Sequence, residues 1–511
     1  VTMTSVRMRW VWAALGVGAL SMLTRRGLFV APPPVPPSLL GRHGGGTGRT
    51  TPREPMAVSR AAVVDQNFTV GIQAEPPRPR RTGLDQPVRE GTGLTARTAM
   101  RLFEAQVESR ILDLLARELK TRGESFYTIG SSGHEGSAAV ADALLPGDMA
   151  FLHYRSGAFY CARAAATPGM DGAFDVLLGA VASSDESIAG GRHKVFGSVE
   201  LCIPPQTSTI ASHLPKAVGY AVALDRRARM EGRSESRIAL CTFGDASSNH
   251  ATAQGALNAA AWSSYQNVPT PVLFVCEDNG YGISVRTPPG WIARNYAHRP
   301  DLAYFHGSGL DLPSAWDAAA AAAAYVRTQR KPAFLHLETV RMLGHAGSDV
   351  EQLYRTPAEI EAGEARDPVL ATARLLIREG WMQPAEVTAL YEGTRRRLSR
   401  LAEEAVRRPK LTTAASVMAP LAPEAPDAVT REVATVAAPE AREAHFRRLP
   451  EAETRGRHLA VQDLAGQVAA IGRDLPPAGA AVLGTDPHKA DQRRAEGLDA
   501  ADPWPGILLA P

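Results

Sequence analysis

Two polar turns, each directly after an apolar segment, hold the side chains best suited to chemistry. The segments at residues 238–243 and 271–277 have the composition of buried strands. The first is followed by Gly-Asp-Ala, which contains Asp245, and the second by Asp-Asn-Gly, which contains Asn279. A helical segment at 251–265 separates them, so the order is strand, helix, strand. Because parallel strands end at a common edge of a sheet, we expect both turns at the edge where such sheets bind ligands.

The oxygen atoms of these turns suit a magnesium ion that carries a phosphate ligand. Asp245, Asn279 and the carbonyl of Tyr281 offer three oxygen donors, and Mg²⁺ completes such a set with phosphate and water. Gly244 would let the backbone approach a diphosphate closely, and the start of the following helix favours an anion. The Asn279-Gly280 pair alone is equally typical of a plain hairpin turn, so this turn by itself leaves both interpretations open.

These turns belong to a longer alternation of helices and strands. The first helix is predicted from about residue 96, and helical and strand segments then alternate as far as Arg341. This alternation predicts an α/β fold, in which a mostly parallel sheet is covered by helices on both faces. From 367 to 410 the pattern is only helical, with Gly380 after one helix and Pro384 in the first turn of the next. The C-terminal part of the folded region is therefore predicted to be helical.

Composition places the chain among ordinary globular proteins. It has 511 residues, of which 44% are hydrophobic and 21% charged, and its formal net charge is +3. This small charge, without a basic stripe interleaved with aromatic residues, argues against nucleic-acid binding. None of the four cysteines lies in a Cys-x-x-Cys motif. We therefore expect free thiols, mostly buried, in a reducing compartment, and a cytoplasmic location.

The two ends of the chain have no sustained helical or strand period. An apolar stretch follows two arginines near the N-terminus, as in a signal sequence, but it is too short to span a membrane comfortably. Two more arginines follow directly, which favours a dispensable tail or an over-extended start, and membrane association is not expected. The expected organisation is a disordered or mis-started tail at 1–56, an extended arm at 57–97, the main domain at 98–410, a linker at 411–455 and a tail without the pattern of a domain at 456–511.

The ordered set of motifs resembles that of thiamine diphosphate enzymes. In that family a Gly-Asp-Gly turn is followed, after a helix and a strand, by Asn-Asn; here Ala246 replaces the second glycine and Asp278 the first asparagine. The motifs HYRSGAFYCAR, GGRHKVFGS, TSTIASHLPKAVG and GHAGSDVEQLYRTPAEI occur in this order. Together they resemble the alpha subunit of the decarboxylating component of 2-oxo acid dehydrogenases, and most of all the branched-chain, 2-oxoisovalerate type. The resemblance covers about residues 98–410 and implies the thiamine diphosphate-binding fold.

The resemblance also implies which residues hold the cofactors. Magnesium would be bound by Asp245, Asn279 and the Tyr281 carbonyl. His345 would be the catalytic histidine, in a loop that Asp349 braces. The residues implied to contact thiamine diphosphate are Tyr154 and Arg155 at the diphosphate, Ser208 and Ile210 at the aminopyrimidine, and Gly244, Asp245, Ala246, Asn279 and His345.

The activity implied is oxidative decarboxylation of branched-chain 2-oxo acids such as 3-methyl-2-oxobutanoate, with transfer of the acyl group to a lipoyl group. The implied partners are a beta subunit that supplies the activating glutamate, in a heterotetramer, and a lipoylated acyltransferase. The chain alone is therefore expected to be inactive. A pyruvate or acetoin dehydrogenase alpha subunit, or a non-catalytic assembly subunit, remains an alternative. Because some relatives fuse the alpha and beta halves, a further hypothesis is that 456–511 is a truncated or frame-shifted beta half.

Overall fold

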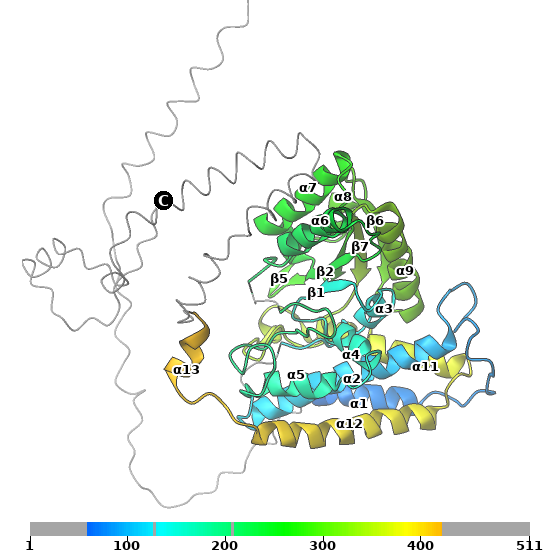
Figure 1. Cartoon of the computed structure of the whole chain (residues 1–511). Helices are drawn as coiled ribbons and strands as arrows, with labels where there is room; N and C mark the ends of the chain where they lie inside the picture. Colours follow the sequence, from blue (N-terminus) through cyan, green and yellow to red (C-terminus); the bar gives the residue numbers. More distant parts are fainter. Residues whose placement is uncertain (1–58, 126–128, 206–208, 422–511) are drawn as a thin grey trace, which may run out of the picture. The chain divides into compact units, whose positions relative to one another are not determined.

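A parallel sheet forms the centre of the protein. The computed structural model describes residues 59–125, 129–205 and 209–421 (Figure 1). Among these, five strands form one sheet in the order β1-β2-β3-β7-β6, and every pairing in it is parallel. These strands are β1 Met149–Phe151, β2 Ala239–Gly244, β3 Val272–Asp278, β6 Ala303–Ser308 and β7 Ala333–Glu338, and a separate pair consists of β4 Tyr281–Gly282 and β5 Val285–Arg286.

Helices surround this sheet and make up the C-terminal part of the described chain. The α-helices are α1 Arg60–Gln73, α2 Ala96–Thr121, α3 Ser137–Asp142, α4 Gly157–Ala165, α5 Gly172–Ala180, α6 Leu214–Glu231, α7 Ala251–Tyr265, α8 Trp291–Tyr296, α9 Leu312–Gln329, α10 Pro357–Glu364, α11 Pro368–Arg378, α12 Pro384–Arg407 and α13 Ala414–Met418. Short 3₁₀ turns are η2 Ala246–Asn249, η3 Glu351–Leu353 and η4 Ala419–Leu421. Within the described residues, no helix has the length and apolarity that crossing a membrane requires.

Alternate residues of the strands pack into two separate hydrophobic cores. Leu240 and Leu273 belong to a core shared with α2, α4, α9 and α12. Their chain neighbours Cys241 and Phe274 belong to a core shared with α6, α7 and α8. The cause is the strand period, since successive side chains point to opposite faces of a sheet. Figure 1 shows α6 and α7 on one side of the sheet and α2, α4 and α12 on the other. The predicted α/β architecture, with helices on both faces, is confirmed.

The segment expected to be an extended arm contains helix α1, so that prediction is wrong for residues 60–73. The Ser59 hydroxyl accepts a hydrogen bond from the Ala62 amide and starts the helix. Val64, Phe68 and Ile72 are buried at a spacing of four residues, which places them on one face. The prolines that suggested an arm begin only after the helix. The rest of the arm, before α2, contains no regular helix or strand.

The C-terminal helices begin and end where the sequence predicted. Gly380 has a φ of +78°, follows α11 and donates its amide to the Ile377 carbonyl. Pro384 occupies the first turn of α12.

All four cysteines are free thiols, and three of them are buried. The predictions for 1–56, for 456–511 and for most of the linker at 411–455 lie outside the described residues.

Candidate functional site

The two polar turns meet at the carboxyl edge of β2 and β3. Gly244 is in register with Glu277, so Asp245 and Asp278 are the next residues on the two neighbouring strands. A plain hairpin from β3 is excluded, because β3 pairs only with β2 and β7, both parallel. Instead, the short β4–β5 pair follows the turn and folds back over the Gly244–Ala246 segment. A Cβ atom built on Gly282 would lie 2.5 Å from the Cβ of Ala246.

Asp245 carries a buried carboxylate without a hydrogen-bond partner among the described residues. It is 1% exposed, and neither of its carboxylate oxygens has a partner there. Burial raises the pKa of Asp245 to about 7, the nearby Thr287 side chain and Ala246 amide oppose this shift without making a hydrogen bond of ordinary geometry, and the neighbouring Asp278 adds to it. Buried polar atoms are normally paired, because an unpaired one costs free energy. A cation bound at this edge would remove that cost, so the residue fits a hard divalent ion that prefers oxygen ligands.

Asn279 is held at both ends of its side-chain amide. Its Oδ1 accepts a hydrogen bond from the Tyr281 amide (3.0 Å), and its Nδ2 lies 3.1 Å from Nε2 of His134. Asp278, which departs from the family motif, instead pairs with Nε2 of His336 on β7 (3.0 Å). The departure at 278 therefore has a structural partner and leaves Asn279 in place.

Arg155 is a buried cation whose hydrogen-bond partners are not carboxylates. It is 4% exposed and donates to the Gly130 carbonyl (2.7 Å) and to the carbonyl and Nδ1 of His345 (3.0 and 2.9 Å). Its guanidinium lies 5.2 Å from the ring centroid of Tyr154, which in turn makes an edge contact with the His345 ring. Burial and the cations Arg155 and Arg341 lower the pKa of His345 to about 4. A buried guanidinium of this kind suits a phosphate or carboxylate ligand.

Arg341 is a second buried cation at this edge, and sequence reasoning missed it. It is 2% exposed and donates to the Ile283 carbonyl (2.7 Å) and to the Tyr354 hydroxyl (2.5 Å). The Tyr354 hydroxyl donates to Asp349, which also accepts the His345 backbone amide. Asp349 therefore braces the histidine loop, as expected. The signal available in the sequence was the arginine three residues after the end of β7, but nothing there indicated its buried neighbours.

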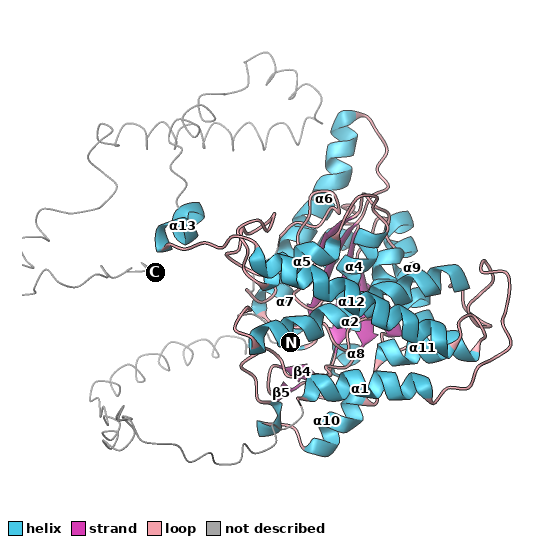
Figure 2. Cartoon of the chain, turned by 90° about the horizontal axis from the view of Figure 1, so that it is seen from below, coloured by secondary structure: helices cyan, strands magenta, loops and turns pink. Residues whose placement is uncertain are grey.

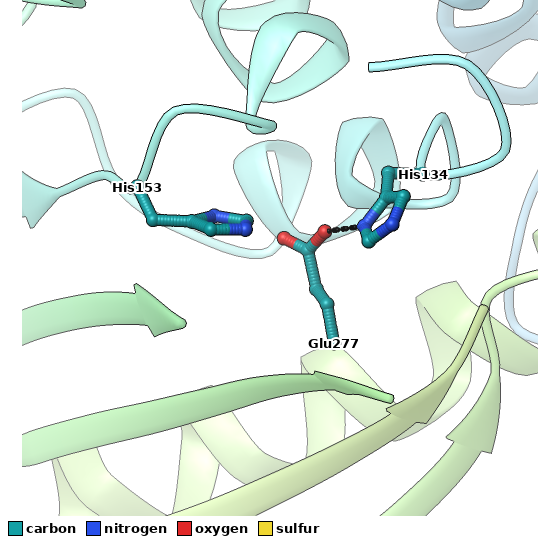
Figure 3. A group of neighbouring side chains, drawn as sticks. All are labelled: His134, His153 and Glu277. Atoms are coloured by element: carbon teal, nitrogen blue, oxygen red, sulfur yellow. Dashed lines mark hydrogen bonds and ion pairs between the residues drawn. The ribbon is translucent and has the colours of Figure 1, made fainter. Parts of the chain in front are cut away.

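A buried group of two histidines and a glutamate lies beside Asn279 and was also missed. Nδ1 of His134 is 2.5 Å from Oε2 of Glu277, and His153 lies on the other side of that carboxylate (Figure 3). Burial lowers the pKa of both histidines, that of His153 to about 3, so both rings are neutral. The three residues come from separate segments of the chain, so no spacing in the sequence could have joined them.

The remaining predicted residues are distributed as follows. Ser208 lies outside the described residues. Ile210 is 41% exposed, as are several other large apolar side chains, so it is accessible to a ligand. A Cβ atom on Gly244 would be 4.0 Å from the Ser247 hydroxyl and in contact with nothing else. The space in front of this glycine is therefore open, as close backbone approach to a ligand requires.

The fold and the site together define a class of protein. Oxygen atoms of the kind that suit a cation and two buried guanidinium groups lie at the carboxyl edge of a parallel sheet, which is the place where α/β proteins bind phosphorylated cofactors. The family model for the dehydrogenase E1 component matches residues 104–414. The chain belongs to this thiamine diphosphate-dependent family, as an alpha component of a 2-oxo acid dehydrogenase.

Comparison with curated proteins gives relatives of low identity. The chain is 24% identical over 331 residues to the mitochondrial 2-oxoisovalerate dehydrogenase subunit alpha of Homo sapiens. The matched region covers 63% of this chain and 70% of that protein. The chain is also 26% identical over 300 residues to 2-oxoisovalerate dehydrogenase subunit alpha of Bacillus subtilis (strain 168). Here the matched region covers 57% of this chain and 85% of that protein.

Proposed function

We propose that the chain is the alpha subunit of a branched-chain 2-oxo acid dehydrogenase that decarboxylates acids such as 3-methyl-2-oxobutanoate. The observation that carries the proposal is the buried carboxylate of Asp245, which makes no hydrogen bond of ordinary geometry among the described residues and follows the strand next to the one that Asn279 follows. The names of the two relatives described above, both 2-oxoisovalerate dehydrogenase alpha subunits, support the choice of substrate.

In this proposal the polar turns bind a magnesium ion and the diphosphate of the cofactor. Asp245, Asn279 and the Tyr281 carbonyl hold the ion, while Tyr154 and Arg155 bind the diphosphate. Ser208 and Ile210 contact the aminopyrimidine. Thiamine diphosphate, when bound, supplies the carbon nucleophile that makes loss of carbon dioxide from a 2-oxo acid feasible. The protein's contribution is to bind and orient the cofactor.

His345 is proposed to act as a neutral hydrogen-bond donor. Because Arg155 donates to its Nδ1, the proton of the imidazole is on Nε2. A pKa of about 4 keeps the ring neutral at pH 7. The Nε2–H group is therefore able to donate a hydrogen bond to an oxygen on which negative charge develops, while the proton stays on the ring.

A beta subunit is proposed to cover this edge and to supply the activating glutamate. Large apolar side chains around the edge are exposed: Ile283 at 56%, Val285 at 71% and Leu353 at 84%. The β4–β5 pair that carries two of them lies near α10 (Figure 2), and the Arg286–Glu359 ion pair joins the two elements. Exposed apolar groups on an ordered segment are typical of an interface with another protein. A lipoylated acyltransferase is the proposed acceptor of the acyl group.

The test is a comparison of substrates with the assembled enzyme. The full chain is purified with its native partner, and 2-oxo acid-dependent reduction of a dye is measured with thiamine diphosphate and Mg²⁺. A higher kcat/KM for 3-methyl-2-oxobutanoate than for pyruvate is the expected result. The reverse preference would indicate the pyruvate or acetoin type. Calorimetry that detects no cofactor binding to the assembled protein would favour a non-catalytic assembly subunit.

A further inference from the structure

The buried group His134, Glu277 and His153 is connected to the proposed metal site through a single hydrogen bond. His134 comes from the loop before α3, Glu277 from the end of β3 and His153 from the segment after β1. All three are at least 92% buried. Figure 3 shows the Glu277 carboxylate between the two rings, bonded to His134. The other ring nitrogen of His134 faces Asn279.

The direction of each hydrogen bond in the series from Tyr281 through Asn279 and His134 to Glu277 follows from one backbone donor. The Tyr281 amide can only donate, so the atom of Asn279 that it contacts is the oxygen Oδ1. The NH₂ group of Asn279 therefore faces Nε2 of His134, which must accept. In a neutral imidazole the other nitrogen, Nδ1, then carries the proton and donates to the Glu277 carboxylate. Each hydrogen bond in the series therefore has one donor and one acceptor, and no two assignments conflict.

The same geometry disfavours a second metal ion within the group. Nδ1 of His134 and Oε2 of Glu277 are 2.5 Å apart, a hydrogen-bond distance. Two ligands on one tetrahedral zinc ion, each about 2.0–2.1 Å from it, would lie about 3.3 Å apart. The Nε2 atom of His134 is also occupied by Asn279.

We propose that His134, held by Glu277, is a positioning residue for the metal site. By accepting from the Asn279 NH₂ group, it acts together with the Tyr281 amide to keep the Asn279 oxygen turned away from His134 and available to the cation. A rotated amide would present an NH₂ group, which cannot bind a cation. Partners behind a metal ligand commonly set its orientation in this way. The inference rests on the proposed function, because that proposal makes Asn279 a metal ligand.

The experiment compares two substitutions of His134 that differ only in hydrogen-bonding ability. In His134→Gln, the NH₂ group of the glutamine can donate to Glu277 while its oxygen accepts from Asn279. Both hydrogen bonds then keep the direction that they have with histidine. In His134→Leu both bonds are lost at similar bulk. The full chain with its native partner is titrated with Mn²⁺ in the presence of thiamine diphosphate, and free Mn²⁺ is measured by electron paramagnetic resonance. Catalytic activity is not needed for this measurement.

The expected result is that His134→Leu weakens Mn²⁺ binding about 10- to 100-fold, whereas His134→Gln retains most of the affinity. Asp148→Asn is the control for lost stability, because Asp148 is a buried carboxylate paired with Arg327 at the opposite edge of the sheet. It should lower the unfolding temperature and leave Mn²⁺ binding unchanged.

Three results would overturn the inference. Wild-type affinity in His134→Leu would show that Asn279 does not depend on His134. Equal losses in the leucine and glutamine variants would show that the direction of the hydrogen bonds is not what matters. A wild-type protein that binds no Mn²⁺ would overturn the proposed function itself, and the inference with it.

Discussion

At the scale of single residues, the buried carboxylate of Asp245 lowers the stability of the protein when no cation is bound, and in the proposed function it serves as a metal ligand. Its pKa of about 7 lies above the value near 3.9 of an exposed aspartate. Between these values the native state binds the proton more tightly than the unfolded state. The contribution of Asp245 to stability therefore falls as the pH rises from about 4 to about 7. Such a trade between stability and function is common at binding sites.

We expect Asp245→Asn to stabilise the metal-free chain at pH 8, by about 1–3 kcal/mol, because an unpartnered buried charge is removed. At pH 5, where the wild-type carboxyl is protonated, the difference should be much smaller. Urea unfolding without divalent ions at both pH values measures this. The same variant should lose magnesium-dependent binding of thiamine diphosphate. A variant less stable than the wild type at pH 8 would contradict this account of Asp245.

Arg155 provides a second prediction at this scale. Arg155→Met should weaken binding of thiamine diphosphate about 10- to 100-fold, since a hydrogen bond to a charged group contributes about 1.5–3 kcal/mol. Arg155→Lys should bind thiamine diphosphate more tightly than Arg155→Met but more weakly than the wild type. The reason is that an ammonium group cannot reproduce the planar guanidinium that reaches Gly130, His345 and a phosphate together. Calorimetric titration measures both affinities. Full recovery with lysine would show that only the charge matters.

At the scale of elements, the site depends on how closely the β4–β5 pair approaches the turn after β2. Gly282 and Ala246 leave no room for one more methyl group. The alanine at 246, where the family has glycine, is therefore accommodated because the residue opposite is a glycine. This contact sets the distance between Tyr281 and Asp245.

Gly282→Ala should consequently push the β4–β5 pair away and weaken cofactor binding, because the new Cβ atom would be 2.5 Å from that of Ala246. The double variant Gly282→Ala with Ala246→Gly should recover the affinity, since the added methyl group then has space. Thiamine diphosphate affinity of the wild type and the three variants, including Ala246→Gly alone, forms a double-mutant cycle. Strictly additive effects would mean that the two positions do not interact.

At the scale of the whole molecule, the described residues form only one side of the expected active site. The exposed apolar side chains Ile283, Val285 and Leu353 border the edge that holds Asp245 and Asn279. The sequence contains no glutamate in a motif that would activate the cofactor, and the proposal assigns this role to a beta subunit.

We therefore expect the purified chain alone to give no turnover with 3-methyl-2-oxobutanoate and a dye acceptor, and the addition of its beta partner to restore turnover. The exposed surface should become protected on assembly, which hydrogen exchange of the β4–β5 pair would detect. As a control, the α12 amides, which lie in the other part of the molecule, should exchange at the same rate in both samples. Full turnover by the isolated chain would contradict the proposal.

Local patterns were sufficient to predict much of the fold. The continuous apolar runs of β2 and β3, the apolar spacing of α2 and the helical composition of α7 and α9 identified these elements, because a strand buried on both faces is apolar throughout whereas a helix buries residues at three- and four-residue spacing. Turn chemistry identified Asp245 and Asn279. Strands β1 and β6 were not predicted: β1 has only three residues, and β6 is half-buried along most of its length.

The neighbours of the site were decided only by the tertiary structure. His134, Glu277 and Arg341 are ordinary residues in the sequence, and their meaning depends on which loops meet at the carboxyl edge of the sheet. The sequence by itself determined the period of each element and the residue types at the ends of the strands, because both are local properties of the chain. Which side chains lie within hydrogen-bond distance, and which charges remain buried without a partner, depended on the packing of distant segments, because contact and burial are properties of the folded chain as a whole.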